Sequence, residues 1–391
     1  MARFKVIVIF LSFLVIIWLG YVYIYSNEKF GYLVSSTSSS NTYSSKIYQK
    51  LNFDISKNDV FSFVHIQKTG GTTMEKHLVI NLKNGNCKCE QSKKPSCMCY
   101  RSVESKEIWL VCRYIQPKWP CGLHPDYASL ATCTPDFIRK KHGQKNYRFL
   151  YGTLLREPVD RYLSEFRHRQ RGASWEGSAI NCKGKSFEGQ NPRCYDGEIW
   201  LDLTLEKFLA CPHNLAANRQ TWMLSNVSDI SCSVKSLMTK VNYQQRLLSR
   251  AKQTISEIAF FGLLEYPRES QFVFEKTFGL EFDEPFQLWD TGFAKVYIDG
   301  VNKELIEKVK KKNSLDAELY KFAKLVFFER YHYFVTLYGH PKFRAPSSES
   351  RFTLKDKKKR RLKENLPKSK AKQETLKRRI KAERARQAEE N

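Results

Sequence analysis

One stretch of the sequence, residues 60–79, restricts the possible fold more than any other. Its apolar and β-branched run is interrupted by Lys-Thr-Gly-Gly-Thr-Thr and then resumes with helical spacing. This pattern predicts a strand, a phosphate-binding loop and a helix. The two glycines can adopt positive φ and bring backbone N–H groups against an anion, and the two threonines after them can cap the helix. Lys68 lies at the mouth of the turn, where its ammonium can reach an oxygen that gains charge during group transfer.

The order of residues in this loop disfavours an ordinary NTPase. A Walker A motif places its lysine after the glycines, whereas Lys68 precedes Gly70 and Gly71. A structural alternative is a Gly-Gly turn that joins a strand to a helix and binds nothing. The lysine, the run of small turn residues and the flanking pattern together favour an anion site.

Strands alternate with helices after this loop. Residues 147–155 and 258–264 are short apolar runs typical of buried strands, and a proline soon after the first run suits the first turn of a helix. Further helices are predicted at 205–224, in two segments, and at 269–278. The alternation predicts an α/β fold with a central, mainly parallel sheet flanked by helices, with ligands at the carboxyl ends of the strands.

Two other segments differ in pattern. Residues 87–133 are rich in cysteine, basic residues and tryptophan and show little periodicity, which predicts a disulfide-pinned, loop-rich surface. Residues 305–338 keep apolar side chains at helical spacing and predict a long helix. The core positions expected in that helix are Leu315, Leu319, Phe322 and Val326.

The termini differ from the body of the chain. Residues 6–27 carry no charged side chain and follow two basic residues, which predicts a retained transmembrane signal anchor with residues 1–5 as its cytosolic tail. Residues 28–56, rich in Ser and Thr, predict a flexible lumenal stem. The folded domain is expected at 57–340, and residues 341–391 form a basic tail that is disordered or partly helical.

The formal net charge of +26 predicts a polyanionic partner, which could be nucleic acid, an anionic membrane or an acidic glycan. A lumenal body counts against nucleic acid. The eleven cysteines predict disulfides behind a membrane anchor, whereas the C-x-C repeats would favour zinc in a reducing compartment. The sequon Asn226-Val227-Ser228 fits a lumenal glycoprotein.

Four segments resemble the heparan sulfate 6-O-sulfotransferase family: HIQKTGGTT at 65–73, CGLHPDY at 121–127, LLREPVDRYLSEFRHRQRGASW at 154–175 and CPHNLAANRQ at 211–220. The resemblance extends from about residue 59 to residue 333. It implies a P-loop-like sulfotransferase fold, 3′-phosphoadenosine 5′-phosphosulfate (PAPS) as co-substrate without a metal, and heparan sulfate or a heparin-like polysaccharide as acceptor. It also implies a single-pass type II protein of the Golgi membrane with a lumenal catalytic domain.

The same resemblance assigns roles in catalysis. Lys68 would stabilise the leaving phosphate and His124 would accept the proton, since an imidazole with a pKa near ~6.5 suits general-base work. From the residues alone, His168 would rank level with His124. Arg156 and Ser164 match the contacts to the 3′-phosphate. The loop residues expected to bind PAPS are His65, Ile66, Gln67, Lys68, Thr69, Gly70, Gly71, Thr72 and Thr73.

Acceptor binding should use cations and aromatic faces along an extended groove. The residues that match acceptor positions of the family are Lys93, Lys94, Arg113, Trp119, His124, His168 and Trp175. For Lys93 and Lys94, solvated charges in a loop are the alternative interpretation.

One segment departs from the family pattern. A loop is expected to close over the nucleotide through Phe286, Gln287, Leu288, Thr291 and Gly292. Relatives commonly have Thr-Arg-Ala near its end, whereas Gly292 and Phe293 leave no arginine there. Two alternatives stay open. One is a related glycan sulfotransferase of other positional specificity, against which CGLH and the segment through Trp175 count. The other is a non-catalytic heparin-binding protein on the same fold, which the altered loop favours and the presence of Lys68 and His124 disfavours.

Overall fold

The computed structural model describes residues 51–90, 96–113, 119–122, 124–170, 203–211, 214–225, 241–287 and 301–342, and the backbone of 181–182 and 185–186. The predicted anchor, most of the predicted stem and the tail from residue 343 lie outside these residues, as does the sequon. Within the described ranges, no helix combines the length and the apolar character needed to cross a membrane.

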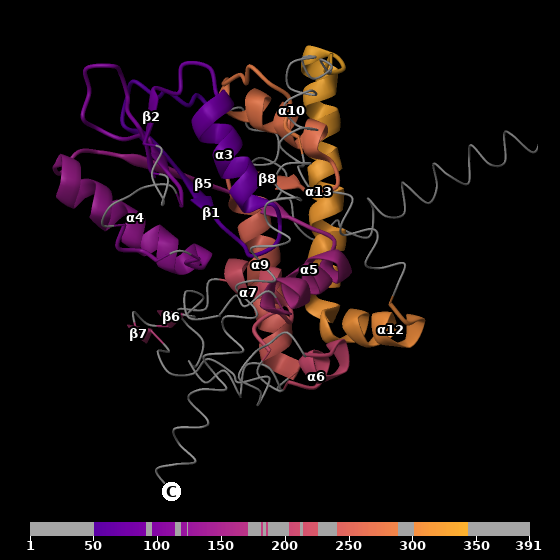
Figure 1. Ribbon diagram of the computed structural model, residues 1–391. Coiled ribbons are helices and arrows are strands. Elements are labelled where there is room, and N and C mark those ends of the chain that lie inside the picture. Colours follow the sequence, from indigo (N-terminus) through magenta and orange to yellow (C-terminus); the bar gives the residue numbers. More distant parts are fainter. Residues whose placement is uncertain are drawn as a thin grey trace, which may run out of the picture.

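Four parallel strands form the central sheet, in the order β4-β1-β5-β8 (Figure 1). They are β4 (Leu110–Val111), β1 (Asp59–Val64), β5 (Arg148–Leu155) and β8 (Phe260–Leu263). All six residues of β1 are buried, as expected for a strand covered on both faces. The predicted α/β fold with a parallel sheet is confirmed, and the predicted strands lie where the apolar runs placed them.

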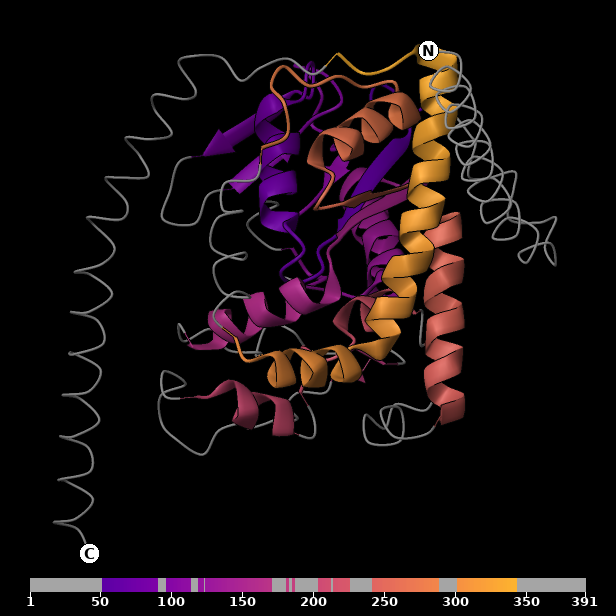
Figure 2. The same ribbon diagram turned by 90° about the vertical axis from the view of Figure 1, so that its right-hand side faces the viewer.

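Helix α4 (Tyr127–His142) covers one face of this sheet (Figures 1 and 2). Its Ile138 packs in a cluster with Val60 of β1, and the hydroxyls of Thr134 and Ser62 lie 3.4 Å apart. Asp126 caps the helix by accepting a hydrogen bond from the Ser129 N–H group.

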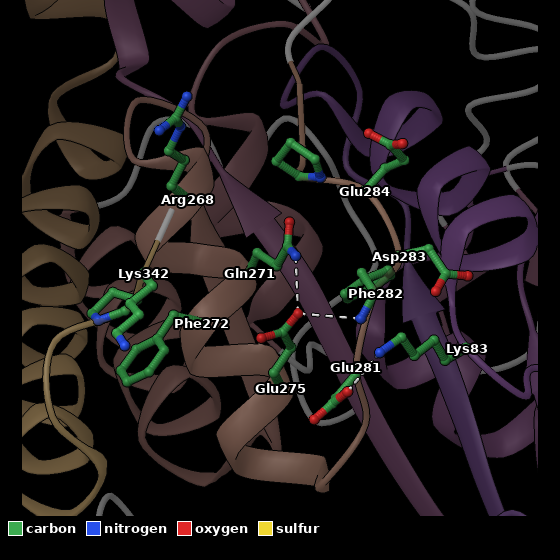
Figure 3. Close-up of a pocket in the computed structure, with 12 residues that line it drawn as sticks. Lys83, Arg268, Gln271, Phe272, Glu275, Glu281, Phe282, Asp283, Glu284 and Lys342 are labelled. Atoms are coloured by element: carbon green, nitrogen blue, oxygen red, sulfur yellow. Dashed lines mark hydrogen bonds and ion pairs between the residues drawn. The ribbon is translucent and has the colours of Figure 1, made fainter. Parts of the chain in front are cut away.

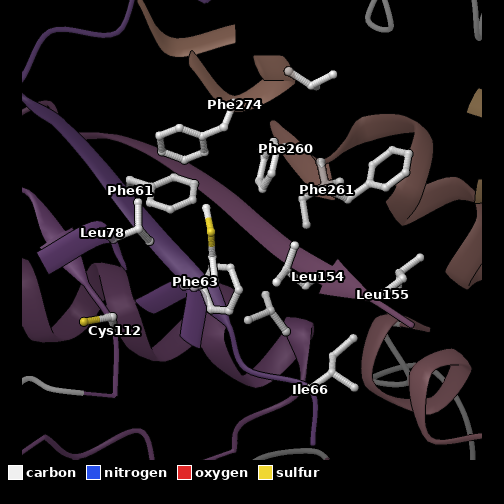
Figure 4. Close-up of a cluster of buried hydrophobic side chains, with 14 of the residues drawn as sticks. Phe61, Phe63, Ile66, Leu78, Cys112, Leu154, Leu155, Phe260, Phe261 and Phe274 are labelled. Carbon is white, nitrogen blue, oxygen red and sulfur yellow. The ribbon is translucent and has the colours of Figure 1, made fainter. Parts of the chain in front are cut away.

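Aromatic side chains fill the other face, below α10 (Pro267–Phe278) (Figure 4). The Phe61 ring lies 5.7 Å from Phe274 and 5.1 Å from Phe278, in edge-to-face contact with both. The position of the Phe61 ring requires glycine at position 152, because a Cβ there would lie 2.6 Å from the Phe61 Cζ. The same core cluster includes Ile66, in the loop that follows β1.

Residues 87–133 contain more regular structure than the sequence indicated. The hairpin β2 (Cys87–Glu90) and β3 (Ser96–Cys99) is closed by two disulfides, Cys87–Cys99 and Cys89–Cys97. The segment also supplies β4, the edge of the central sheet, and the first turns of α4. The prediction of a loop-rich surface was wrong in this respect, whereas the disulfide interpretation of the cysteine group is confirmed.

The remaining helices pack around the carboxyl ends of the strands and along the sheet edge. They are α3 (Gly71–Asn81), α5 (Pro158–Gln170), α6 (Leu205–Ala210), α7 (Arg219–Leu224), α9 (Val241–Glu257), α12 (Lys303–Lys312) and α13 (Ser314–Tyr338). Figure 2 shows α9 and α13 side by side. A short two-stranded ladder joins β6 (Asn181–Cys182) to β7 (Lys185–Ser186). Helix α9 was not predicted.

The predicted tract 305–338 is two helices instead of one. Asn313 separates them, because its side chain donates to the Val309 carbonyl at 2.9 Å and accepts the Asn218 N–H at 3.1 Å. In α13, Leu319 and Val326 are buried as predicted, whereas the other two expected core positions are partly buried.

The folded domain also begins earlier than expected. Leu51 donates its N–H group to the Thr277 carbonyl at 3.0 Å, and the Phe53 ring contacts Trp109 and Phe278 edge-on. Residues 51–56, expected at the end of the stem, therefore pack on the domain.

Candidate active site

The loop between β1 and α3 has the backbone shape that its sequence predicted, with one shift in position. Lys68 has φ 67° and Gly70 has φ 87°, so positive φ falls on the lysine and the first glycine. Gly70 is the N-cap of α3 without a side-chain cap bond. The predicted capping by Thr72 and Thr73 was wrong, because both already lie in the first turn of the helix.

Neighbouring side chains hold this loop tightly. A Cβ at Gly70 would lie 2.3 Å from Leu264 Cδ1, just beyond β8, and a Cβ at Gly71 would lie 3.0 Å from the His65 ring. Thr69 is buried and donates its hydroxyl to the Ile66 carbonyl at 3.0 Å. The loop therefore presents the amino end of α3 with no acidic residue in its first turn, an arrangement suited to an anion.

Arg156, at the end of β5, reaches the same loop. Its Nη1 donates to the Lys68 carbonyl at 3.2 Å. Its backbone N–H and carbonyl pair with the Gln220 side-chain amide at 2.8 and 2.9 Å. Burial lowers the pKa of Arg156, and Asp160 and Glu265 oppose that shift. The structure therefore brings Arg156 to the phosphate loop, whereas Ser164 lies half-buried in the second turn of α5.

Gln67 is fixed by two buried arginines to which the sequence analysis gave no role. Arg219 Nε donates to Gln67 Oε1 at 2.8 Å, and Arg161 Nη1 donates to the Gln67 carbonyl at 3.4 Å. Burial lowers the pKa of Arg219 to about 10, which still leaves the guanidinium charged at neutral pH. Arg219 lies in the CPHNLAANRQ motif at 211–220, and this motif is the feature of the sequence that could have indicated a role for Arg219.

His124 lies against the start of the loop. Its Nδ1 is 3.2 Å from the His65 carbonyl, and the two imidazole rings meet edge to face with centroids 4.8 Å apart. A carbonyl oxygen only accepts, so Nδ1 carries the hydrogen and Nε2 has the lone pair of the neutral ring. Burial, together with electrostatic interactions with His65, Arg219 and Arg113, lowers the pKa of His124 to about 3, and the hydrogen bond to the His65 backbone opposes this shift. The disulfide Cys121–Cys133 anchors the chain just before it.

Arg113 and Glu75 connect the segment after β4 to the loop. Glu75 is buried, and its Oε1 accepts the Arg113 N–H at 2.8 Å while its Oε2 accepts from His65 Nδ1. Arg113 Nη1 donates to Thr72 Oγ1 at 2.6 Å. Glu75 was missed from the sequence, although it lies three and four residues before Leu78 and Val79, on the buried side of the helix.

The other predicted site residues make contacts of their own elsewhere in the fold, or fall outside the described part of the chain. Trp119 donates its indole N–H to the Gly122 carbonyl at 2.8 Å, and its ring packs on Phe137. His168 is half-buried near the end of α5, and Gln287 is half-buried. Phe286 is buried, 5.3 Å from the His77 ring. The predicted residues outside the described ranges are Lys93, Lys94, Trp175, Leu288, Thr291 and Gly292.

A surface pocket lies at the opposite end of α3, lined by α10 and by Lys83 and Lys342 (Figure 3). It contains Glu275, Glu281 and Asp283, and carboxylates do not suit an anionic nucleotide. An eleven-residue helix separates it from the loop, roughly 16 Å along the axis. None of the predicted site residues that the structure describes lines it, so the loop at the amino end of α3 is the better candidate.

Comparison with known proteins agrees with this site. A family model described as "Sulfotransferase family" matches residues 51–323. Heparan-sulfate 6-O-sulfotransferase 1-B of Danio rerio is 41% identical over 314 residues, which cover 77% of this chain and 76% of the relative. Heparan-sulfate 6-O-sulfotransferase 2 of Gallus gallus is 40% identical, with 80% and 77% covered, and heparan-sulfate 6-O-sulfotransferase 1 of Homo sapiens is 40% identical, with 74% and 70% covered. At this identity and coverage, the chain belongs to the heparan-sulfate 6-O-sulfotransferase family.

Proposed function

We propose that this protein transfers a sulfuryl group from PAPS to the 6-hydroxyl of glucosamine residues in heparan sulfate. Membership of the family supports the reaction, because the matched relatives are named for it. The observation that carries the proposal is the convergence of Lys68, Arg156 and His124 on one loop at the amino end of α3.

The donor would bind at this loop. Sulfuryl transfer breaks the bond between sulfur and the phosphate oxygen and forms a bond between sulfur and the acceptor oxygen, through a loose transition state. Negative charge then collects on the leaving phosphate. Lys68, the N–H groups at the start of α3 and Arg156 supply the positive charge that stabilises it. The residues present therefore fit a phosphosulfate donor.

The acceptor hydroxyl would give its proton to Nε2 of His124. Because the pKa of His124 is lowered to about 3, the ring is neutral at physiological pH and its lone pair is free to accept. A bound donor brings several negative charges, which favour the imidazolium form and raise its pKa during the reaction. Arg113, half-buried beside the loop, offers a cation for a sulfate or carboxylate of the acceptor.

The cellular setting is part of the proposal. Residues 6–27 would anchor the chain in the Golgi membrane as a single-pass type II protein, with the described domain in the lumen. The three disulfides that join pairs of described cysteines agree with an oxidising compartment. Resistance of the domain to external protease in sealed microsomes, and its digestion only after detergent is added, would support this orientation. Digestion of the domain by external protease would contradict it.

The test of the reaction uses purified protein, sulfur-labelled PAPS and N-sulfated heparosan, followed by disaccharide analysis. Label at carbon 6 of glucosamine is the expected result, also in the presence of EDTA, because protein cations supply the charge. Label at another position would indicate a related sulfotransferase. Binding of heparin without transfer would favour a non-catalytic protein.

Lys68→Ala tests the loop itself. Turnover should fall by roughly 100-fold or more, as when one oxyanion-type donor is removed. Lys76→Ala is the matched control, since Lys76 is exposed on α3, the helix that follows the loop. A loss under tenfold for Lys68→Ala, with an unchanged fold, would contradict the assigned role.

A further inference from the structure

Glu75 is a buried acid at the centre of the site. Its side chain is fully shielded from solvent, in the second turn of α3, and a buried carboxylate is costly unless its oxygens accept hydrogen bonds. Both oxygens do so: Oε1 accepts the Arg113 N–H at 2.8 Å, and Oε2 accepts from His65 Nδ1. Glu75 takes no direct part in the proposed transfer, although it contacts both Arg113 and His65.

One arm of Glu75 leads to the proton acceptor. The His65 ring is held between the carboxylate, the backbone of Gly71 and the His124 ring. The His65 carbonyl then accepts from His124 Nδ1 at 3.2 Å. That hydrogen bond sets the tautomer of His124 and leaves its Nε2 able to take the acceptor proton. A shift of the His65 ring would therefore also displace the His65 carbonyl, whose hydrogen bond sets the tautomer of His124.

The other arm leads to the acceptor cation. The hydrogen bond from Arg113 to Oε1 fixes the backbone of the segment after β4. The Arg113 guanidinium turns back to Thr72, in the first turn of the same helix, at 2.6 Å. The phosphate loop thus lies at the amino end of α3. Four residues after Gly71, the carboxylate of Glu75 fixes both the backbone of Arg113 and the ring of His65, which supports His124.

We propose that Glu75 is a positioning residue that aligns His124 and Arg113 with the phosphate loop. The inference rests on the proposed function, because it concerns the relative positions of the sulfate donor, the general base and the acceptor hydroxyl in that reaction. A misplacement of about 1 Å at such a site can cost roughly 100-fold in rate. Glu75 itself touches neither donor nor acceptor, so its removal should impair turnover far more than nucleotide binding.

The test is Glu75→Gln in the full-length protein. The amide keeps the size of the side chain but has one acceptor oxygen, so its NH₂ group meets one of the two donors. We expect kcat to fall roughly 10- to 100-fold, as for other groups that orient a reacting residue. The Kd of adenosine 3′,5′-bisphosphate, measured by calorimetry, should stay near that of the wild type. Lys76→Gln, at the next position and exposed, is the matched control and should keep both values.

A double-mutant cycle with His124→Ala shows whether Glu75 acts through the base. If it does, Glu75→Gln should lower kcat much less when His124 is already absent. Equal losses in both backgrounds, or a parallel loss of kcat and nucleotide affinity, would make Glu75 a structural residue of the loop and overturn the proposal.

Glu75→Asp covers the case in which the glutamine variant does not fold. It keeps the charge but withdraws the carboxylate by one methylene, so kcat should fall while nucleotide affinity is retained. A soluble Glu75→Asp protein with the kcat of the wild type would overturn the proposal. Failure of the proposed function would look different, because the wild-type protein would then transfer no sulfate to carbon 6.

Discussion

The two sides of the active site are held by different kinds of bond. On the cysteine side, residues 87–133, three disulfides close short loops around β2, β3 and the start of α4. On the charged side, which comprises α5, α7 and the first turns of α13, buried ion pairs lie within α5 and between α5 and α13, and hydrogen bonds join α7 to α13. The ion pairs of the charged side are Arg161–Glu165, Arg169–Glu165 and Arg161–Asp316.

This difference determines how each side can fail. A disulfide restricts the unfolded chain and desolvates no charge. A buried ion pair stabilises only while every partner is present, because desolvation of the remaining charge is costly. Burial raises the pKa of Asp316, and the charge of Arg161 and hydrogen bonds from Thr221 and Gln220 oppose the shift. The charged side should therefore be the more sensitive to loss of a single side chain.

The largest effect is expected for Asp316→Ala on the charged side. The substitution removes the acceptor of the Thr221 and Gln220 N–H groups, at 2.8 and 3.2 Å, and the partner of Arg161 at 3.8 Å. The free energy of unfolding, measured in urea, should fall by about 3–5 kcal/mol. Because Gln220 also holds the backbone of Arg156, nucleotide binding should weaken as well.

Glu318→Ala is the control for this change, since Glu318 is exposed two positions along the same helix. Its effect should stay within about 0.5 kcal/mol. A loss of less than about 1 kcal/mol for Asp316→Ala would show that the network does not depend on this residue.

On the cysteine side, replacing Cys121 and Cys133 with serine should cost about 3 kcal/mol, from the entropy of a loop closed over a sequence separation of 12 residues. Turnover should fall in addition, because His124 lies three positions after Cys121. The measurements are urea unfolding and kcat at saturating substrates.

The disulfide Cys89–Cys97 provides the matched comparison, with a separation of 8 residues. Its replacement should lower stability by a similar amount, about 2.6 kcal/mol by the same loop entropy, but leave kcat unchanged. Equal effects of the two replacements on kcat would mean that the Cys121–Cys133 bond does not position the histidine.

The site features that the sequence predicted are local. The turn at Lys68 and Gly70 and the start of α3 are determined by neighbouring residues. An apolar strand followed by glycines that can adopt positive φ favours a tight turn into a helix. The place of Arg156 in the site is also predicted by its immediate neighbours. It follows an apolar strand, and parallel strands direct their carboxyl ends to one edge of the sheet.

The features that were missed depend on partners far apart in the chain. Arg161 meets Asp316 across more than 150 positions, and Glu75 accepts from the backbone of Arg113, 38 positions away. A charged residue in a helix usually predicts an exposed position, and only packing decides otherwise. Strand β4 escaped notice because it has two residues, too few for a period of two to be recognised.

Acid should loosen α3, which contacts β2 of the cysteine side. Burial lowers the pKa of His77 on α3 to about 4, so between pH 6.5 and 4 the unfolded chain binds a proton that the folded chain does not. Stability from this group is complete above pH 6.5 and falls as the pH drops. At pH 5 the loss relative to pH 7 should be about 2 kcal/mol.

His77→Phe tests this assignment, because a phenyl ring preserves the stack on Phe282, whose centroid is 4.1 Å away. Thermal melts from pH 7 to pH 4.5 should show a shallower decline for the variant than for the wild type. Identical slopes would assign the acid sensitivity to other groups.

The smallest effect is expected for an exposed pair with the same spacing as a buried one. Glu304 and Lys308 on α12 lie 2.6 Å apart at i,i+4, and both side chains are more than half exposed. Arg161 and Glu165 on α5 have the same spacing and distance but are 0% and 1% exposed. Water and salt screen the first pair, whereas the second is shielded from both.

Double-mutant cycles should give a coupling energy for the α12 pair that is close to the error of a urea experiment and vanishes in 1 M NaCl. The α5 pair should keep a large, salt-independent coupling energy. If the two pairs had similar coupling energies and similar salt dependence, burial would not distinguish the charged side from the protein surface, and the contrast between covalent and ionic support of the site would lose its basis.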